Sequence, residues 1–403
     1  MKIGFIHPSW PGGEGTGATH TANQIIEGLT NQDHEITVYC AERPQVSKHQ
    51  TSDIDIKYLS EGGIPHTNIA LNKAIQGRFD EFDQYDLVSS YLTSLIPAME
   101  TISEKTSAST LVTLNAYAGV CPKNDLQYMD NTRCDDNSPS RCLPCIAKTS
   151  GGSQKHGRAY RIASRLGNYK LIKSIEPEKL SIDGFHALSE HVKQTYSEFD
   201  FPSERITVIP NPIDESFVVP HESGFSEPYK LLYVGYLEEH KGVEMLPKLM
   251  ARLDERDREF RLTIAGDGGL RSEVEQSVLE LDLEDAVNFR GHVPYEELPS
   301  VYANHDIFVY PGQWEEPFGR VFLEAMGAKT PIVATNVGAA GKIIGEAGSV
   351  VEPTVSALSE EIISIAQHQS LSQLSINARK ERKRYNPTQI QQEFETLYKS
   401  LIK

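Results

Sequence analysis

The sequence lacks long hydrophobic runs: no stretch of its 403 residues approaches the ~18 consecutive apolar residues of a membrane-spanning helix. The first residues pass directly into an apolar strand, without the charged, apolar and small-residue regions of a secretory signal. No Asn-x-Ser/Thr glycosylation sequon with a permitted middle residue occurs. We therefore expect a cytoplasmic protein, free or peripheral on the cytoplasmic face of a membrane.

Basic residues are scarce, with 39 Lys and Arg against 56 Asp and Glu and a formal net charge of −17. Because phosphate contacts need a basic surface, this balance argues against general nucleic-acid binding. The composition, 39% hydrophobic and 24% charged, is that of a globular protein. A chain of this length is long enough to form two domains, each with its own hydrophobic core.

Short apolar strands alternate with helical patterns from both ends of the chain, which predicts parallel, doubly wound sheets. This alternation of strands and helices is interrupted at 121–150, a segment rich in Cys, Asp, Asn, Ser and Pro. The strands predicted in the first half are 2–6, 34–41, 53–59, 85–91, 109–115, 182–189 and 204–214. Those predicted in the second half are 230–237, 260–268, 286–291, 306–312 and 330–338.

A polar segment with Gly and Pro, residues 215–228, indicates a linker between the two halves. We therefore predict an α/β protein with two Rossmann-like, doubly wound domains, residues 1–215 and 229–385. The last residues, 386–403, begin at a proline and are amphipathic. They predict a terminal helix that returns to the N-terminal domain.

Two glutamates, Glu316 and Glu324, lie eight positions apart in WEEPFGRVFLEAM, after a predicted strand. Ligands of open α/β sheets bind at this end of the strands. A helix beginning near Pro317 or Phe318 would offer unpaired N–H groups to a phosphate. Glu316 would then accept from sugar hydroxyls and Glu324 from another part of a nucleotide sugar. The alternative is that Glu316 caps the helix and Glu324 is an ordinary solvated residue.

Nearly the whole chain resembles the GT-B glycosyltransferases of the large retaining family 4. The similar segments are GEGTGATHTANQIIEGL, HALSEHVKQTY, ITVIPNPID, LLYVGYLEEHKG, IAGDGGLRSEV, FRGHVPYEELPSVYANHDIFVYP, the Glu-x7-Glu segment and EAMGAKTPIVATNVG. The resemblance implies two domains facing a cleft and closing by a hinge. It also implies a UDP- or GDP-sugar donor, a glycan, lipid-linked or small-molecule acceptor, retention of anomeric configuration and no catalytic metal.

The resemblance also implies roles for individual residues. Glu316 would hold donor-sugar hydroxyls, Glu324 the ribose and Lys241 the phosphates. The catalytic candidates are Glu316, Asn115 and Lys241. The donor-binding candidates are Gly15, Gly17, Tyr236, Lys241, Gly266, His292, Val293, Glu316, Phe318, Gly319, Arg320 and Glu324.

Two positions depart from the family pattern. Tyr236 replaces a usual arginine, so one diphosphate cation is missing unless Arg320 or another side chain supplies it. Asn115 replaces a frequent histidine; it cannot act as an acid or base, and we interpret it as a positioning hydrogen-bond donor. The alternative function is therefore a non-catalytic nucleotide-sugar-binding relative. A third is another GT-B enzyme, such as an epimerase or a phosphorylase, although no pyridoxal-phosphate lysine motif is evident.

Four cysteines form a C-x12-C-x7-C-x2-C pattern within the insertion at 121–150 of the N-terminal domain: Cys121, Cys134, Cys142 and Cys145. In a chain without a secretory signal, the pattern favours a structural Zn²⁺ over disulfides. Disulfides or unlinked thiols are the alternatives. An insertion in this domain could frame the acceptor site.

A basic segment runs from Arg141 to Lys173, where the chain has eight Lys and Arg and no Asp or Glu. Its centre is amphipathic, with Arg158, Arg161 and Arg165 bordering an apolar helical face. Such a helix can lie on an anionic membrane or meet a lipid-linked phosphate acceptor. The alternative is a helix packed on its own domain with a solvated basic face.

Overall fold

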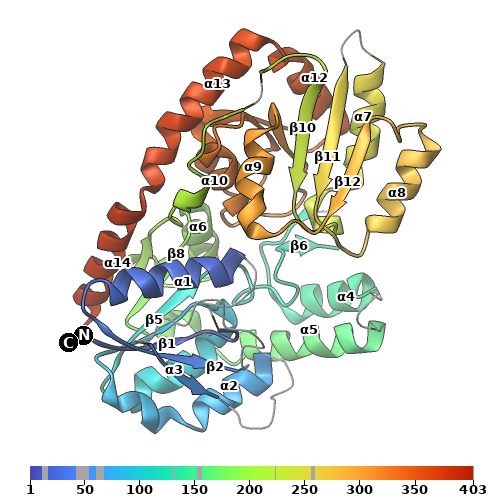
Figure 1. Ribbon diagram of the computed structural model, residues 1–403. Coiled ribbons are helices and arrows are strands. Elements are labelled where there is room, and N and C mark those ends of the chain that lie inside the picture. Colours follow the sequence, from blue (N-terminus) through green and yellow to red (C-terminus); the bar gives the residue numbers. More distant parts are fainter. Residues whose placement is uncertain are drawn as a thin grey trace. The chain divides into compact units, whose positions relative to one another are not determined.

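The computed structural model describes residues 1–10, 17–41, 54–59, 68–129, 132–151, 157–222, 224–255 and 259–402 (Figure 1). The chain forms two compact units. Unit 1 is Met1–Pro212 with Thr388–Lys403, and unit 2 is Ile213–Pro387. Each is built on a parallel sheet with crossover connections, which confirms the prediction of two Rossmann-like, doubly wound domains.

Unit 1 contains a seven-stranded sheet in the order β3-β2-β1-β4-β5-β8-β9. Its central strands are buried along their whole length, as expected for a parallel sheet covered on both faces. The strands are β1 Lys2–Ile6, β2 Glu35–Cys40, β3 Asp55–Tyr58, β4 Leu87–Ser90, β5 Ser109–Leu114, β8 Gly184–Ala187 and β9 Ile206–Val208. A separate antiparallel pair, β6 Gln127–Tyr128 and β7 Thr132–Arg133, lies in the predicted insertion.

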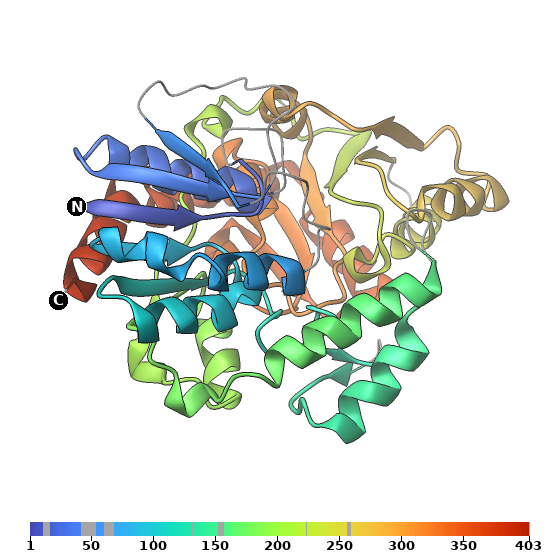
Figure 2. The ribbon, with the colours of Figure 1, turned by 90° about the horizontal axis from the view of Figure 1, so that it is seen from below.

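The helices of unit 1 include two that are packed side by side, α4 and α5, and that Figure 2 shows in green. These two helices carry most of the basic segment. The unit's helices are α1 Gly17–Thr30, α2 Asn68–Gln76, α3 Ile96–Lys105, α4 Pro139–Thr149, α5 Arg158–Ile172, α6 Glu190–Glu198 and α14 Pro387–Leu401.

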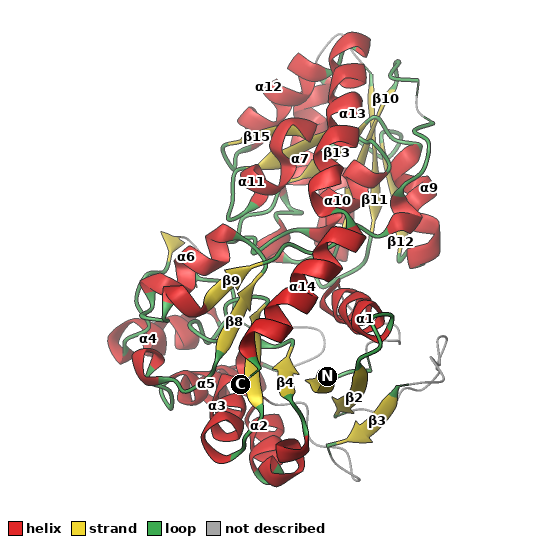
Figure 3. Ribbon diagram, turned by 90° about the vertical axis from the view of Figure 1, so that its left-hand side faces the viewer, coloured by secondary structure: helices red, strands yellow, loops and turns green. Residues whose placement is uncertain are grey.

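Unit 2 contains a six-stranded parallel sheet in the order β12-β11-β10-β13-β14-β15, with helices packed on it (Figure 3). Its strands are β10 Tyr229–Val234, β11 Phe260–Ala265, β12 Val287–Gly291, β13 Ile307–Tyr310, β14 Ile332–Thr335 and β15 Gly348–Val351. Its helices are α7 Met245–Asp254, α8 Arg271–Glu280, α9 Leu298–Ala303, α10 Arg320–Gly327, α11 Ala340–Ile344, α12 Val355–Ile365 and α13 His368–Glu381.

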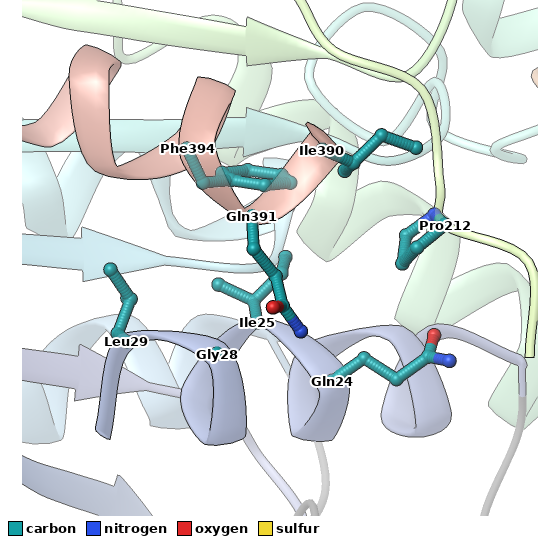
Figure 4. A pocket seen from close by; sticks show the side chains of 8 residues that line it. All are labelled: Gln24, Ile25, Gly28, Leu29, Pro212, Ile390, Gln391 and Phe394. Atoms are coloured by element: carbon teal, nitrogen blue, oxygen red, sulfur yellow. The ribbon is translucent and has the colours of Figure 1, made fainter. Parts of the chain in front are cut away.

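The last helix, α14, packs onto unit 1 along an apolar stripe whose buried side chains are Ile390, Phe394, Leu397 and Tyr398. Its Gln391 lies against Gly28 of α1, beside a cavity of about 10 Å³ that both helices line (Figure 4). A Cβ atom on Gly28 would lie 2.7 Å from Cγ of Gln391, so the missing side chain permits this close approach. The Tyr398 hydroxyl also donates to the hydroxyl of Ser89 on β4 at 2.8 Å.

Three local expectations differ from the structure. The segment expected to be a linker is packed onto unit 2, with Phe217 fully buried against Tyr295 and Tyr302. Strand β15 is an additional strand whose sequence, GSVV, has only two apolar β-branched residues and whose residues are half-buried. Helix α10 begins at Arg320, not near Pro317 or Phe318, because Gly319 adopts a left-handed conformation.

The structure contains no helix, within its described residues, that is long and apolar enough to cross a membrane.

Candidate functional site

The strand order of unit 2 reverses between β10 and β13, which are parallel neighbours although two strands separate them in sequence. Ligands of open α/β sheets bind at the carboxyl ends of strands flanking such a switch point. The loop after β10 carries Lys241, and the loop after β13 carries Glu316. The two candidates therefore come from both sides of the switch point.

Glycines lie at the carboxyl ends of three adjacent strands of this sheet, β10, β11 and β12. The N–H of Gly266 donates to the carbonyl of Gly291 at 2.7 Å, and the N–H of Gly235 to the carbonyl of Ala265 at 3.0 Å. Gly266 has a φ of +148°, and a Cβ atom there would lie 1.9 Å from the carbonyl oxygen of Gly235. Only glycine fits this position, so the missing side chain permits the close approach of the ends of β10 and β11.

Lys241 and Glu316 form an ion pair. Nζ of Lys241 lies 3.0 Å from Oε2 of Glu316 and 3.2 Å from the hydroxyl of Tyr310. The same carboxylate oxygen accepts hydrogen bonds from the Tyr310 hydroxyl and, at 3.0 Å, from the indole N–H of Trp314. Glu316 is only 5% exposed, so this buried carboxylate is charge-paired and hydrogen-bonded, as a buried charge must be.

The ionisation of Glu316 follows from these contacts. Burial by itself raises the pKa of the carboxyl group. The charge of Lys241 and the hydrogen bonds from Tyr310, Lys241 and Trp314 act in the opposite direction, and the pKa of Glu316 falls below its ordinary value. Glu316 is therefore anionic near neutral pH and can accept hydrogen bonds from hydroxyl groups.

Lys241 is enclosed by aromatic rings, which the sequence interpretation did not identify. Its Nζ lies 4.7 Å from the centroid of the Trp314 ring and 5.4 Å from that of Tyr310. The ring of His240 packs edge-on against Trp314, and burial and the Lys241 charge lower the pKa of His240 to about 4. His240 is thus neutral at neutral pH and does not replace Lys241 as the charge partner of Glu316. Trp314 stands two residues before Glu316, and this closeness in sequence is the only feature from which its place beside the ion pair could have been predicted.

Glu324 belongs to a second group of polar side chains. It is 8% exposed and accepts a hydrogen bond at 3.0 Å from the hydroxyl of Tyr302. Nearby, Arg320 donates to the hydroxyl of Tyr295 at 3.1 Å, and Tyr295 donates to Asp214 at 2.9 Å. Burial raises the pKa of Glu324, and the Arg320 charge only partly offsets it. The alternative that Glu324 is a solvated helix residue is therefore wrong.

The first turn of α10 lies between these two groups in sequence. Gly319 is its N-cap, with a φ of +82°, and no side chain caps the helix. The alternative that Glu316 caps this helix is therefore wrong. The amide groups at its start can meet an anion, as helix N-termini do. A Cβ atom at Gly319 would lie 2.3 Å from the ring of Phe322, so the turn requires glycine.

The remaining donor candidates in unit 2 lie at the same edge. Tyr236 follows β10 and is 60% exposed, while its carbonyl accepts from the Tyr233 hydroxyl at 2.9 Å. His292 follows β12 and is exposed, and the next residue, Val293, is buried. Phe318 is buried and packs edge-on against Tyr385. Phe318 can therefore offer a backbone group but no accessible side chain.

Unit 1 carries the other candidates. Asn115 follows β5, and its Oδ1 accepts from the hydroxyl of Thr93 at 2.9 Å and from its N–H at 3.3 Å. Because Thr93 occupies the oxygen, the amide N–H groups are what Asn115 can offer to a ligand. Gly17 is the exposed first residue of α1. Gly15 lies outside the described residues.

The four cysteines of the insertion are free thiols: Cys121, Cys142 and Cys145 are buried, and Cys134 is half-buried. Burial, with contributions from the other three, raises the pKa of Cys142 to about 12. The N–H of Met129 donates to the sulfur of Cys145 at 3.4 Å. No group of three Cys, His, Asp or Glu in the described part of the chain is arranged to hold a metal ion. Zinc binding stays a prediction.

The three arginines of the basic segment contact the C-terminal end of α4. Arg158 donates to the carbonyl of Ala147 at 3.1 Å and Arg161 to that of Gly151 at 3.0 Å. Arg165 donates to the hydroxyls of Thr149 and Ser150 at 3.1 and 3.0 Å. Cations at this end complement the helix dipole and unpaired carbonyls, so these arginines hold α4 and α5 together. Lys155 lies outside the described residues.

Comparisons with known proteins agree with this geometry. Residues 219–382 match the family described as glycosyl transferases group 1. Alpha-D-kanosaminyltransferase of Streptomyces kanamyceticus is 37% identical over 125 residues, which cover 30% of this chain and 32% of that protein. Glycogen synthase of Mycobacterium tuberculosis is 33% identical over 181 residues, 44% of each chain. The chain thus spans less than half the length of these relatives.

Solved structures match over the full length. Sucrose-phosphate synthase from Thermosynechococcus elongatus superposes with a TM-score of 0.75 at 21% identity, covering 99% of this chain and 98% of that one. HepE from Anabaena, in complex with UDP-glucose, gives 0.70 at 17% identity and covers 100% of both chains. These likenesses show the two-domain GT-B fold. The match to the glycosyl transferases group 1 family is confined to residues 219–382, which lie within unit 2.

Proposed function

We propose that this protein is a retaining glycosyltransferase that moves a sugar from a nucleotide-sugar donor, a UDP- or GDP-sugar, to a glycan, lipid-linked or small-molecule acceptor. The observation that carries the proposal is the Lys241–Glu316 pair beside the switch point of unit 2. The curated relatives are named as transferases and synthases, which favours an enzyme over a non-catalytic binding protein.

The two groups of polar side chains suit the two ends of a nucleotide sugar. Glu316 is anionic and lies beside Lys241, so it suits sugar hydroxyls next to a phosphate. Glu324 lies about one turn into α10, eight residues after Glu316, and suits the ribose hydroxyls. Between them, the uncapped start of α10 offers backbone N–H groups to the diphosphate. This order of groups matches the order of parts in the donor.

Catalysis of glycosyl transfer needs stabilisation of the negative charge that develops on the leaving diphosphate. An ammonium group has three N–H donors, and the bonds to Tyr310 and Glu316 use two of those of Lys241. We propose that the third meets a phosphate oxygen, together with the α10 amides. We assign Glu316 to hydroxyl binding and not to nucleophilic attack, because three donors already surround its Oε2 atom.

Binding of donor can be tested by thermal shift with UDP-, GDP- and ADP-sugars, because ligand binding stabilises the native state by mass action. We expect one nucleotide class to raise the melting temperature and to be hydrolysed slowly when no acceptor is present. Glu324→Gln should weaken binding of the free nucleotide by roughly 10- to 150-fold, from a hydrogen bond worth ~1.5–3 kcal/mol.

The matched control is Glu284→Gln, which changes the same chemical group at an exposed position of unit 2. It should bind the nucleotide like the wild type. Stabilisation by no nucleotide sugar would refute the proposal. Binding without any hydrolysis or transfer, across a panel of acceptors, would favour the non-catalytic alternative.

A further inference from the structure

The α4–α5 pair exposes apolar side chains to solvent. On α4 the exposed residues include Leu143, Pro144, Ala147 and Lys148, and on α5 they include Ala159, Ala163, Leu166 and Lys170. We call these eight residues the hairpin surface. Their spacing of three and four places each set on one face of its helix. Leu143 is 44% exposed and Leu166 is 41% exposed, and each lies beside exposed alanine and lysine residues of its own helix.

Helix α5 is only lightly attached to unit 1. Of its 15 residues, only Ile172, near its end, is buried. The attachment to α2 lies in its second half, where Gly167 packs on Ile69 and Asn168 bonds to Asn68 at 2.9 Å. The described part of unit 1 therefore leaves uncovered most of the first half and the side of the second half that carries Leu166 and Lys170.

The electrostatics of this pair of helices are opposite to those of the chain. Residues 141–173 contain no Asp or Glu, in a protein of net charge −17. Both faces of the hairpin surface carry an exposed lysine next to apolar side chains. An interfacial helix has this composition, since its apolar side chains enter the boundary of the lipid and its lysines meet anionic headgroups.

We propose that the hairpin surface docks on an anionic lipid bilayer. Leu143 and Leu166 enter the headgroup region, and Lys148 and Lys170 pair with lipid phosphates. The arginines take a different role from the one expected from the sequence, because Arg158, Arg161 and Arg165 already donate to the end of α4. They keep the two helices together and add positive charge without being the inserting groups.

The first test is co-sedimentation of the full chain with vesicles of phosphatidylcholine, with or without phosphatidylglycerol. Wild type should pellet with the anionic vesicles at low salt and be largely released at high salt, because salt screens these charges. Lys148→Glu with Lys170→Glu should weaken vesicle partitioning at least ~30-fold, from about one factor of five for each lost cation. Leu143→Ser with Leu166→Ser should weaken it about tenfold.

The matched controls change the same residue types elsewhere. Lys248→Glu with Lys380→Glu reverses two exposed lysines of unit 2, and Leu279→Ser with Ile376→Ser removes two exposed apolar side chains there. Both controls should bind vesicles like the wild type. Circular dichroism and thermal melting should show that every variant is folded.

Depth of insertion separates a bilayer from a soluble polyanion. In Leu166→Trp, brominated lipid should quench the fluorescence of the new tryptophan above the background of the two natural ones. Wild type remaining in the supernatant with anionic vesicles would overturn the proposal. So would vesicle binding that neither double variant weakens. Binding to heparin or DNA that the lysine pair weakens, without lipid quenching, would assign the surface to a soluble polyanion instead.

Discussion

The Lys241–Glu316 pair makes a strong prediction about stability. Removing either partner leaves the other charge buried, since the side chains are only 19% and 6% exposed. We expect Glu316→Gln or Lys241→Met alone to lower the free energy of unfolding of unit 2 by about 3–5 kcal/mol. Removing both charges together should cost much less than the sum of the single changes. From the sequence we would expect loss of Glu316 to affect donor binding more than folding; the structure indicates a cost to both.

The magnitude follows from the geometry. Charges separated by 3.0 Å, the distance from Nζ to Oε2, attract each other by about 5–6 kcal/mol at an effective dielectric constant of ~20. Desolvation of both groups offsets much of this attraction, so the pair contributes little net stability although breaking it is costly. The double variant should therefore show a coupling free energy of at least about 3 kcal/mol, the upper end of the range for residues in contact.

The two tryptophans provide the assay, because Trp10 lies in unit 1 and Trp314 in unit 2. In a Trp10→Phe background, urea unfolding monitored by fluorescence reports on unit 2 alone. This matters because a two-unit chain does not have one two-state unfolding transition. Single and double variants are compared at pH 7 in this background.

The pair also predicts a pH dependence. The pKa of Glu316 is lowered in the folded protein, so its contribution is present above the ordinary glutamate value of 4.5 and is lost as pH falls through the folded pKa. The Lys241→Met, Glu316→Gln double variant should lack this acid loss. Additive single effects, or an unchanged acid profile in the double variant, would refute the assignment of a coupled buried pair.

Other predictions concern close backbone approaches and the thiols. Gly319→Ala should destabilise unit 2 by about 1–3 kcal/mol in the same urea assay, because φ is +82° and the new methyl group meets the ring of Phe322. The control Gly269→Ala, which has open space around it, should leave the stability of unit 2 nearly unchanged. Gly28→Ala should destabilise unit 1 by about 1–3 kcal/mol in a Trp314→Phe background, and adding Gln391→Ala should restore most of this loss. If Gly28→Ala leaves the urea midpoint of unit 1 unshifted, the packing of α14 on α1 is contradicted. Elemental analysis should find about one zinc per chain, lost in Cys142→Ser with Cys145→Ser but kept in Cys40→Ser; metal-free protein with reactive thiols would refute the zinc hypothesis.

Most of the fold could be predicted because parallel strands have a strong local signal. The buried strand β13, IFVY, is a continuous apolar run, and β5, STLVTL, is rich in β-branched residues and leucine. The packing of segment 215–228 onto unit 2 could not be predicted. Its composition is that of a linker, yet the ring of Phe217 packs against the rings of Tyr295 and Tyr302, which are distant in sequence.

The candidate site was predictable residue by residue but not as an arrangement. Lys241 and Glu316 are 75 positions apart, and only the pairing of β10 with β13 brings their loops together. The partners that set the charge state, Tyr310 and Trp314, lie within or beside the same segment as Glu316. Their aromatic character gave no sign that they would donate hydrogen bonds to a carboxylate.

The arginines of α5 show that the charge pattern of one helix does not by itself predict which groups its charged side chains contact. Arg158, Arg161 and Arg165 are spaced as a basic border, which favours a surface that binds anions. Each instead reaches the C-terminal end of α4, whose carbonyls and dipole are negative. That partner exists only because α4 and α5 pack side by side. Reversing all three charges would therefore separate the helices as well as change the surface, so the exposed lysines are the residues that isolate membrane attraction from folding.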